Sequence, residues 1–347
     1  MAEQPYDALL LVSFGGPEGR DEVIPFLENV LRGRDVPRER MLQVAEHYYH
    51  FDGVSPINQQ NRQLIAALQA RFAADGPNLP IYWGNRNWNP LLTDALRQMR
   101  ADGVKRALAF VTSAYSSYSG CRQYRGNIAD GQNAVGPGAP AVDKIRAFYN
   151  HPGFIGPMAE RVEDAFAKIP MERRGTAELI FTAHSVPLSM AASSKYVDQL
   201  DEACRLVGEA VGRNDYRLVW QSRSGPPTQP WLEPDICDYL RQLREKGVRD
   251  AVVAPIGFIS DHMEVIFDLD TEARQVASNI GLNLVRSGTV GTHPDFVGMI
   301  RELILERTSP ESTPRRALGD LGPSHDLCPV DCCAAPQLAA RPSAQRA

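Results

Sequence analysis

The sequence predicts an α/β protein built from two similar doubly wound, Rossmann-like domains with parallel sheets. One observation is its length of 347 residues, which exceeds an average domain and suits two. A second is the alternation of short apolar runs with longer stretches of helical periodicity, which is typical of βαβ units. We expect domains at residues 1–145 and 146–310, followed by a tail at 311–347 rich in Pro, Ala and Ser that carries a cysteine cluster.

The predicted strands are short runs rich in apolar and β-branched residues. They are Tyr6–Phe14, Leu79–Trp83, Arg106–Thr112, Glu178–Ala183, Tyr216–Gln221, Asp250–Phe258 and Leu282–Val285. Between them, Leu64, Leu68 and Phe72 repeat at i, i+4 and i+8, as residues on one helix face do. Gly131–Pro140 is rich in Gly and Pro and predicts a loop, and the chain after Thr308 is predicted to pack poorly apart from its cysteines.

Composition narrows the possible functions. A net charge of −5 indicates no surface for nucleic acid, and no apolar run approaches the roughly 20 residues of a transmembrane helix. The start, MAEQPYDALLLVSFGG, lacks the basic region and cleavage site of a signal peptide, so we expect a cytoplasmic protein. Six cysteines are too few for a disulfide scaffold, and the group Cys328, Cys332 and Cys333 suggests metal before disulfide.

Polar or glycine-rich residues follow six of the predicted strands. These segments are Ser13–Pro17, Gly84–Pro90, Ser113–Gly120, Ala183–Ser185, Gln221–Pro226 and Gly257–His262. In open α/β sheets ligands bind outside the carboxyl ends of the strands. The sequence therefore predicts a binding site where hydroxyls, aromatic rings, histidines and an arginine gather on one rim.

The segment DHMEVIFDLDTE carries a regular series of acids. Glu264, Asp268 and Glu272 are spaced i, i+4 and i+8, and on a helix they form one acidic line. Such carboxylates suit a divalent metal in transit. The alternative is structural: Asp261-x-x-Glu264 is also a capping-box pattern, and the other two acids can lie on a solvated helix face.

Four further features each have two interpretations. His184 ends a predicted strand and suits a general base or metal ligand, or a hydrogen-bonded structural residue. The SAYSSYSG segment suits either a pocket for a large planar ligand with carboxylates or a polar surface loop. Arg86 suits a bidentate pair with a carboxylate, or a structural salt bridge. The clustered cysteines can ligate zinc or iron–sulfur with a fourth ligand from elsewhere, or can be incidental in a disordered tail.

Taken together, the motifs resemble the ferrochelatase family. They are LLLVSFGGPE, GVSPIN, GNRNWNP, SAYSSYS, FTAHSVP around His184, LVWQSRSGP with PWLEP, and PIGFISDHMEVIFDLD around Glu264, in the family's order over roughly residues 6–290. FTAHSVP and the SDHxE block are the most specific. The resemblance implies chelatase-type domains enclosing a porphyrin cleft, and a lyase that inserts Fe²⁺ with loss of two pyrrole protons.

The resemblance also implies roles for single residues. His184 and Glu264 would be catalytic and would meet the metal, with Asp268 and Glu272 continuing a path outward; the face of iron entry stays open. The positions implied to bind the porphyrin are Phe14, Ser55, Arg86, Tyr118 and Trp231. Phe14 stands where many relatives carry tyrosine or methionine, which puts an axial ligand from this position in doubt.

Some ferrochelatases carry a [2Fe–2S] cluster held by three C-terminal cysteines and one internal cysteine. Cys328, Cys332 and Cys333 are similar in placement but differ in spacing, and Cys121 is the candidate fourth ligand. The SAYSSYSGCRQYR segment looks like bacterial forms that convert coproporphyrin III to coproheme, with protoporphyrin IX as the alternative. Rival interpretations are another tetrapyrrole chelatase and a non-catalytic haem-binding protein. We expect a monomer, with transient contacts to neighbouring haem-pathway enzymes.

Overall fold

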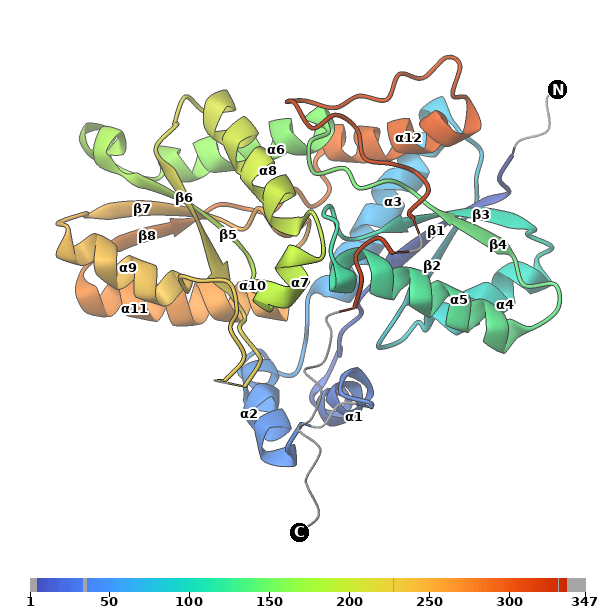
Figure 1. The fold of residues 1–347 in the computed structure, drawn as a ribbon, viewed down its shortest axis with the longest axis horizontal. Helices are drawn as coiled ribbons and strands as arrows, with labels where there is room; N and C mark the ends of the chain where they lie inside the picture. The colour runs from blue at the N-terminus through green and yellow to red at the C-terminus, as the bar shows by residue number, and fades with distance from the viewer. Residues whose placement is uncertain (1–4, 34–35, 227, 330, 336–347) are drawn as a thin grey trace, which may run out of the picture.

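The computed structural model describes residues 5–33, 36–226, 228–329 and 331–335. They form two four-stranded parallel sheets side by side, with helices around them (Figure 1). The first sheet has the order β2-β1-β3-β4 and the second β6-β5-β7-β8. The strands are β1 (Ala8–Ser13), β2 (Ile81–Asn85), β3 (Arg106–Val111), β4 (Ala141–Lys144), β5 (Glu178–His184), β6 (Tyr216–Gln221), β7 (Asp250–Ala254) and β8 (Asn283–Arg286). Both sheets therefore repeat one doubly wound order, which confirms the predicted fold class.

Helices cover both faces of the sheets, so strands β1 and β7 are buried along their whole length. The helices of the first half are α1 (Arg20–Val30), α2 (Arg38–Tyr49), α3 (Ile57–Asp75), α4 (Leu92–Ala101), the π-helix η1 (Tyr118–Arg122) and α5 (Gln123–Val135), of which α1 and α2 pack on each other beyond the sheets (Figure 1). In the second half they are α6 (Pro152–Ala167), the 3₁₀ helix η2 (Met171–Thr176), α7 (Leu188–Ala192), α8 (Tyr196–Ala210), α9 (Ile236–Glu245), α10 (Met263–Phe267), the π-helix η3 (Asp268–Ala273), α11 (Arg274–Ile280) and α12 (Pro294–Thr308).

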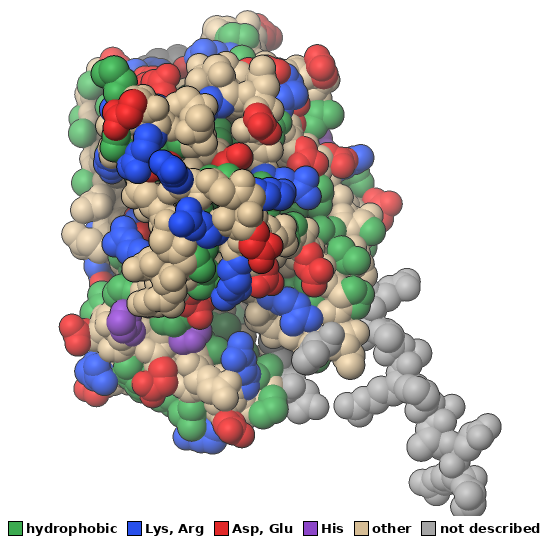
Figure 2. All heavy atoms as spheres, turned by 90° about the vertical axis from the view of Figure 1, so that its left-hand side faces the viewer, with side chains coloured by type: hydrophobic (Ala, Val, Ile, Leu, Met, Phe, Trp, Pro, Cys, Tyr) green, Lys and Arg blue, Asp and Glu red, His purple; other side chains and the backbone are tan. Residues whose placement is uncertain are grey.

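One apolar core joins the two halves. It includes Leu9 and Phe110 from the first sheet, Phe181 from the second, and Phe296 from α12, all fully buried. Although α12 comes last in sequence, it packs against both α3 and α6 (Figure 1). On the face of the second half that Figure 2 presents, acidic and basic side chains are interspersed. No helix among the described residues is long and apolar enough to cross a membrane.

One strand was not predicted, and one predicted loop was wrong in part. Strand β4, AVDK, was missed because two of its four residues are charged and it pairs only along one edge. The predicted loop Gly131–Pro140 begins inside α5, which continues to Val135. Gly131 allows α4 and α5 to approach, since a Cβ there would lie 2.7 Å from Leu96 Cδ1.

The C-terminal segment, defined as residues 309–329 and 331–335, buries few side chains: Leu321 is 54% and Leu327 75% exposed, whereas Cys333 is 4% exposed. The poor packing expected apart from its cysteines is therefore confirmed for these residues. Hydrogen bonds still hold the segment on the domains: the Asn150 amide donates to the carbonyls of Leu318 (3.1 Å) and Gly322 (2.9 Å), and the Leu318 amide donates to Asn150 O (2.8 Å). Residues 336–347 of the predicted tail lie outside the described part of the chain.

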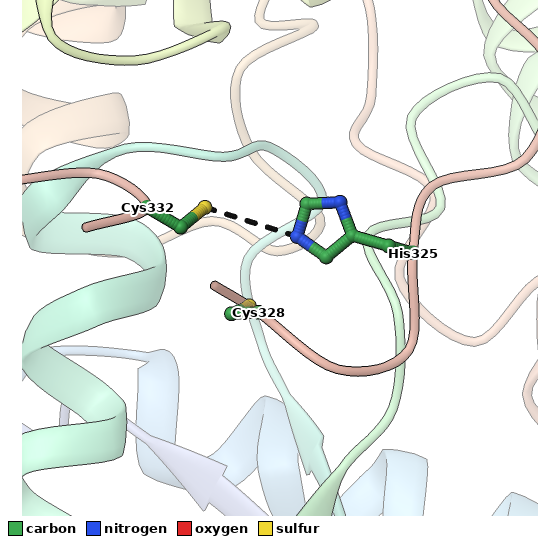
Figure 3. A group of neighbouring side chains, drawn as sticks. All are labelled: His325, Cys328 and Cys332. Atoms are coloured by element: carbon green, nitrogen blue, oxygen red, sulfur yellow. Dashed lines mark hydrogen bonds between the residues drawn. The ribbon is translucent and has the colours of Figure 1, made fainter. Parts of the chain in front are cut away.

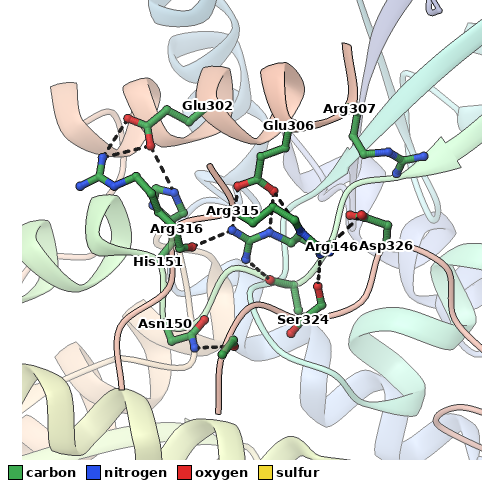
Figure 4. Close-up of polar contacts among 12 residues, drawn as sticks. Arg146, Asn150, His151, Glu302, Glu306, Arg307, Arg315, Arg316, Ser324 and Asp326 are labelled. Atoms are coloured by element: carbon green, nitrogen blue, oxygen red, sulfur yellow. Dashed lines mark hydrogen bonds and ion pairs between the residues drawn. The ribbon is translucent and has the colours of Figure 1, made fainter. Parts of the chain in front are cut away.

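A buried ion pair fixes the start of this segment (Figure 4). Arg146 follows β4 and Glu306 lies on α12, and their side chains are only 0% and 2% exposed. Arg146 donates to both carboxylate oxygens, at 2.8 and 2.9 Å, and to the carbonyl of Arg316 at 2.8 Å. The two hydrogen bonds to Glu306 and the one to the Arg316 carbonyl satisfy most of the hydrogen-bonding capacity of the buried Arg146 guanidinium. Arg146 therefore anchors both α12 and the C-terminal segment.

Candidate functional site

A histidine and a glutamate meet at the carboxyl edge of the second sheet. His184 ends β5, and Glu264 lies on α10, which follows the adjacent strand β7. Because β5 and β7 are neighbours at the point where the strand order reverses, their following segments converge. The His184 Nε2 and Glu264 Oε1 atoms lie 3.5 Å apart, and the side chains are 32% and 45% exposed.

The start of α10 explains how Glu264 is held. The ring Nδ1 of His262 accepts a hydrogen bond from the Glu264 amide at 3.2 Å, so His262 caps the helix. Asp261 instead forms an ion pair with Arg286 at 3.1 Å. The capping box that the sequence allowed between Asp261 and Glu264 is therefore replaced by a histidine cap, which leaves the Glu264 carboxylate to face His184.

Charge pairing decides the protonation of this pair. Burial lowers the pKa of His184, but the Glu264 charge, the hydrogen bond with it and the Ser185 carbonyl outweigh burial and raise the pKa to about 9. Burial raises the pKa of Glu264, but the charge and hydrogen bond of His184 outweigh it and lower the pKa to about 2. At neutral pH the pair therefore holds one proton, as imidazolium beside carboxylate.

Asp268 extends the acidic line from Glu264. Burial raises the pKa of Asp268 to about 7, helped by the charges of Glu264 and Glu272 and opposed by a hydrogen bond from Ser222. The Gln221 amide donates to the Glu264 carbonyl (3.0 Å) and lies 3.4 Å from the Asp268 carboxylate. Asp268 is thus poised to gain or lose a proton near neutrality.

Glu272, the last acid of this line, has different neighbours from Asp268. Burial and the nearby Asp235 raise the pKa of Glu272. Asp270, between Asp268 and Glu272 in sequence, is not part of this line and pairs with Arg286 at 2.8 Å. All three acids lie on the π-helix η3.

Aromatic side chains surround the segments that follow β1 and β2 in the first half. Phe14, after β1, contacts Phe26 edge-on with ring centroids 6.3 Å apart. The Arg86 guanidinium lies 5.5 Å from the Phe14 ring and 5.0 Å from the Tyr124 ring. Phe14 and Arg86 therefore belong to one cation–aromatic cluster after the first strands.

The other predicted porphyrin contacts lie around this region in different states of burial. Ser55 is 4% exposed and packs under Gly16, where an added Cβ would approach Ser55 Cβ to 2.7 Å. Tyr118 is the first residue of η1 and is partly buried. Trp231 pairs with Pro187 through a backbone bridge, which fixes it to the loop that follows His184.

Sequence reasoning missed several residues that shape the site. Gln221 and Ser222 hold Asp268, and the Tyr196 hydroxyl donates to the His184 carbonyl at 3.1 Å. The QSRSGP motif, which follows a buried strand, could have pointed to Gln221 and Ser222. Tyr196 lies on α8 and has no comparable signal in the sequence.

The four cysteines predicted to hold a cluster lie close together. Cys121 is on η1, and Cys328, Cys332 and Cys333 are in the C-terminal segment, the first two of them shown in Figure 3. Hydrogen bonds from Cys328 and Cys333 lower the pKa of buried Cys121 to about 2, whereas donating to Cys121 raises the pKa of both partners. The Cys332 and Cys333 sulfurs are 3.7 Å apart. Arg122 and Arg125 donate to the carbonyls of Cys332 (3.2 Å) and Cys328 (3.4 Å), which docks the C-terminal segment beside Cys121.

Solved structures define the class of this fold. SirB from Bacillus subtilis with Fe³⁺ superposes with a TM-score of 0.56 at 11% identity, covering 90% of this chain and 99% of that one. A Deinococcus radiodurans protein described as structurally similar to chelatases gives 0.51 at 15% identity, over 92% and 57%. The two repeated four-stranded sheets therefore share the fold of these chelatase-like structures.

Sequence comparisons identify the family. The family model described as Ferrochelatase matches residues 6–308. A Rhodopirellula baltica protein named ferrochelatase is 60% identical over 95% of this chain and 93% of its own length. Streptomyces griseus and Streptomyces coelicolor proteins named coproporphyrin III ferrochelatase are 53% and 52% identical, each over 98% of this chain and 96% of their own. The chain belongs to the ferrochelatase family and is a lyase that inserts iron into a porphyrin.

The His184 titration is expected to depend on Glu264. In a Glu264→Gln variant the carboxylate charge is gone, while the burial that disfavours imidazolium stays. The pKa of His184 should then fall from about 9 to its ordinary 6.5 or below, leaving the ring neutral at pH 8. Histidine-selective ¹⁵N NMR titration measures this, with His184→Ala assigning the signal. His151, whose pKa burial and the Arg146 and Arg316 charges lower to about 3, is the control. A His184 pKa still near 9 in the variant would contradict the pairing.

Proposed function

We propose that this enzyme inserts Fe²⁺ into coproporphyrin III and releases coproheme. The observation that carries this choice is the naming of both Streptomyces relatives, each more than half identical over nearly the whole chain, as coproporphyrin III ferrochelatases. The Rhodopirellula relative is named without a porphyrin, so protoporphyrin IX stays the second candidate. Coproporphyrin carries four propionates, and Arg86, which contacts the Phe14 and Tyr124 rings, is a cation that could pair with one of them.

We propose that His184 and Glu264 are the catalytic pair. Metal insertion must release two protons from pyrrole nitrogens, and a ligating imidazole must itself be deprotonated. The shared proton on His184–Glu264 would therefore pass to solvent when Fe²⁺ binds there. After the iron has moved into the ring, the vacated pair can take up one of the two pyrrole protons, and the other passes to solvent. An incompletely satisfied pair open to solvent binds metal weakly, which suits a substrate ion that must leave with the porphyrin.

Asp268 and Glu272 are proposed to carry protons or metal between this pair and solvent. Asp268, with its pKa raised by burial to about 7, changes charge readily at neutral pH. Phe14, Ser55, Tyr118 and Trp231 are proposed to contact the porphyrin. Phe14 supplies an aromatic face and no ligand atom to iron.

Anaerobic assays with Fe²⁺ test the substrate. We expect coproporphyrin III to be metallated with a kcat/KM at least about tenfold above that for protoporphyrin IX, a difference of about 1.4 kcal/mol in transition-state binding. The same assay on Arg86→Lys tests the part played by Arg86. Lysine keeps the positive charge but not the planar guanidinium, so the ratio of kcat/KM for coproporphyrin III to kcat/KM for protoporphyrin IX should fall. Equal or faster turnover of protoporphyrin IX would overturn the coproporphyrin assignment.

We also propose a [2Fe–2S] cluster on Cys121, Cys328, Cys332 and Cys333. Four thiols gathered at one place, with Cys121 favouring thiolate, fit the ligands that such a cluster requires. The cluster would supply a one-electron redox centre and would tie the C-terminal segment to η1. The six free thiols among the described residues agree with a reducing, cytoplasmic setting. The monomeric state and contacts with other haem-pathway enzymes stay predictions.

A Cys121→Ser variant is expected to lose the cluster, because serine cannot replace the buried thiolate. The measurement is iron, labile sulfide and the visible spectrum after anaerobic purification. The control is Cys237→Ser, a partly buried thiol on α9 outside the group. Wild-type protein without iron or sulfide under these conditions would remove the cluster proposal.

A further inference from the structure

Helix α2 of the first half reaches the second half through an aromatic contact. The His47 ring stacks on the Phe267 ring, with centroids 3.7 Å apart and planes only 8° from parallel. Helix α2, which lies below both sheets in Figure 1, contacts α10, and Phe267 is the last residue of α10. Stacked aromatic rings attract each other beyond the effect of the area that they bury. His47 therefore holds the carboxyl end of α10 against the first half.

A second contact from the first half holds the residues just before α10. The Asp261 amide donates a hydrogen bond to the Gln60 side-chain oxygen Oε1 at 2.8 Å, and Gln60 lies in the first turn of α3. Asp261 and Phe267 stand on either side of Glu264 in the sequence. The first half therefore holds the segment that carries Glu264 at both of its ends.

The second half holds the same segment from its own side. Arg286, the last residue of β8, pairs with Asp261 at 3.1 Å and with Asp270 at 2.8 Å, and these acids lie before and after α10. These ion pairs fix α10 to the sheet that carries His184, whereas the contacts with α2 and α3 fix it to the first half. The position of the Glu264 carboxylate therefore depends on both halves.

We propose that His47 and Gln60 are positioning residues that hold Glu264 in place for iron insertion. The inference rests on the proposed catalytic role of the His184–Glu264 pair, whose Nε2 and Oε1 atoms lie 3.5 Å apart. A shift of α10 changes that separation, and a misplacement of about 1 Å can cost about 100-fold in rate. Neither positioning residue needs to touch iron or the porphyrin, because each acts through the segment that it holds.

His47→Ala tests the stacked contact in the full-length enzyme, assayed anaerobically with Fe²⁺ and whichever porphyrin the wild type metallates faster. We expect kcat to fall about 10–100-fold, because Glu264 is no longer held, while KM for the porphyrin stays within about twofold. His47→Phe keeps a ring that can stack on Phe267 but has no ring nitrogen, so it should return kcat to within about threefold of wild type.

His50→Ala is the matched control for the loss of a histidine. His50 follows α2, is exposed and meets Phe267 only edge-on, with centroids 6.3 Å apart. This variant should keep the wild-type kcat. Because His47 and Phe267 are only partly buried, His47→Ala should also keep the wild-type fold, which thermal unfolding checks.

Gln60→Met tests the other end of the segment, because methionine is similar in size but offers no amide oxygen to the Asp261 amide. This variant should lower kcat about tenfold with little change in KM, whereas Gln60→Glu keeps an acceptor and should recover most of the loss. Hydrogen–deuterium exchange should also be faster in the peptide covering residues 255–267 of Gln60→Met and of His47→Ala, since α10 is held less firmly.

The pattern of results separates this proposal from the catalytic assignment on which it rests. If His184→Ala and Glu264→Gln lose activity while His47→Ala and Gln60→Met keep the wild-type kcat, the positioning role is wrong and the catalytic pair stands. A raised KM with unchanged kcat in His47→Ala, or no recovery in His47→Phe, would assign His47 to contact with the substrate and overturn its positioning role. Wild-type rates in His184→Ala and Glu264→Gln would overturn both proposals together.

Discussion

Replacing His184 by alanine is expected to lower kcat/KM for iron insertion by about 10²–10⁴-fold, the usual contribution of a positioned acid–base group. The variant loses the imidazole whose Nε2 atom lies 3.5 Å from Glu264 Oε1. It therefore also loses the group proposed to release a proton when iron binds. Anaerobic single-turnover spectroscopy of porphyrin metallation measures the effect on chemistry apart from product release. Because both side chains are partly exposed, the fold should survive, which thermal unfolding checks.

The double variant with Glu264→Gln decides whether the two residues act as one unit. If the pair works together, the double variant should lose no more activity than the worse single variant, since residues that act jointly are strongly non-additive. Additive losses would assign the residues to separate steps. A His184→Ala enzyme with the wild-type rate would contradict the catalytic role altogether.

Glu306→Gln is expected to lower the free energy of unfolding by about 3–5 kcal/mol. The change leaves the Arg146 guanidinium, whose side chain is 0% exposed, without its counter-charge in the interior. Chemical denaturation followed by circular dichroism measures the loss. Limited proteolysis should also cut the C-terminal segment sooner, because Arg146 fixes the Arg316 carbonyl.

Glu302→Gln is the matched control for this effect. Glu302 lies one turn earlier on α12 and pairs with Arg316 at 3.1 Å, but its side chain is 34% exposed. Ion pairs with such access to water contribute about 0–1 kcal/mol, so this variant should lose little. Replacing Arg146 by Met and Glu306 by Leu together should recover much of the stability lost in Glu306→Gln. Equal destabilisation by Glu302→Gln and Glu306→Gln would show that the buried pair is not the cause.

The strands were predictable where burial on both faces produced continuous apolar runs, as in β1 and β7. Strand β4 was not, because an edge strand with two charges carries little apolar signal. To predict that His184 lies beside Glu264, the strand order would also have been needed, because β5 lies beside β7 in the sheet although β6 lies between them in sequence. The motifs named the residues, but only the topology brings their side chains within 3.5 Å.

The contacts of the C-terminal segment lay beyond sequence reasoning for a different physical reason. Arg146 and Glu306 are 160 residues apart, and neither charge differs in the sequence from a solvated surface residue. Composition rich in Pro, Ser and Ala predicted poor packing, and the side chains of this segment are indeed mostly exposed. Its hydrogen bonds could not be predicted, because side chains such as Asn150 donate to its backbone carbonyls, and backbone acceptors leave no trace in residue type.

The position of α12 bears on how the protein is made on the ribosome. This helix packs on α3, and Arg301 donates to the Gly76 carbonyl at 2.7 Å, so an early part of the chain awaits one of the last helices. The apolar face of α3, with Leu64 and Leu68, has been synthesised long before Phe296 and its neighbours emerge. The first half therefore completes its core only after α12 has been synthesised, and a nascent chain arrested before Pro294 exposes a surface prone to aggregation.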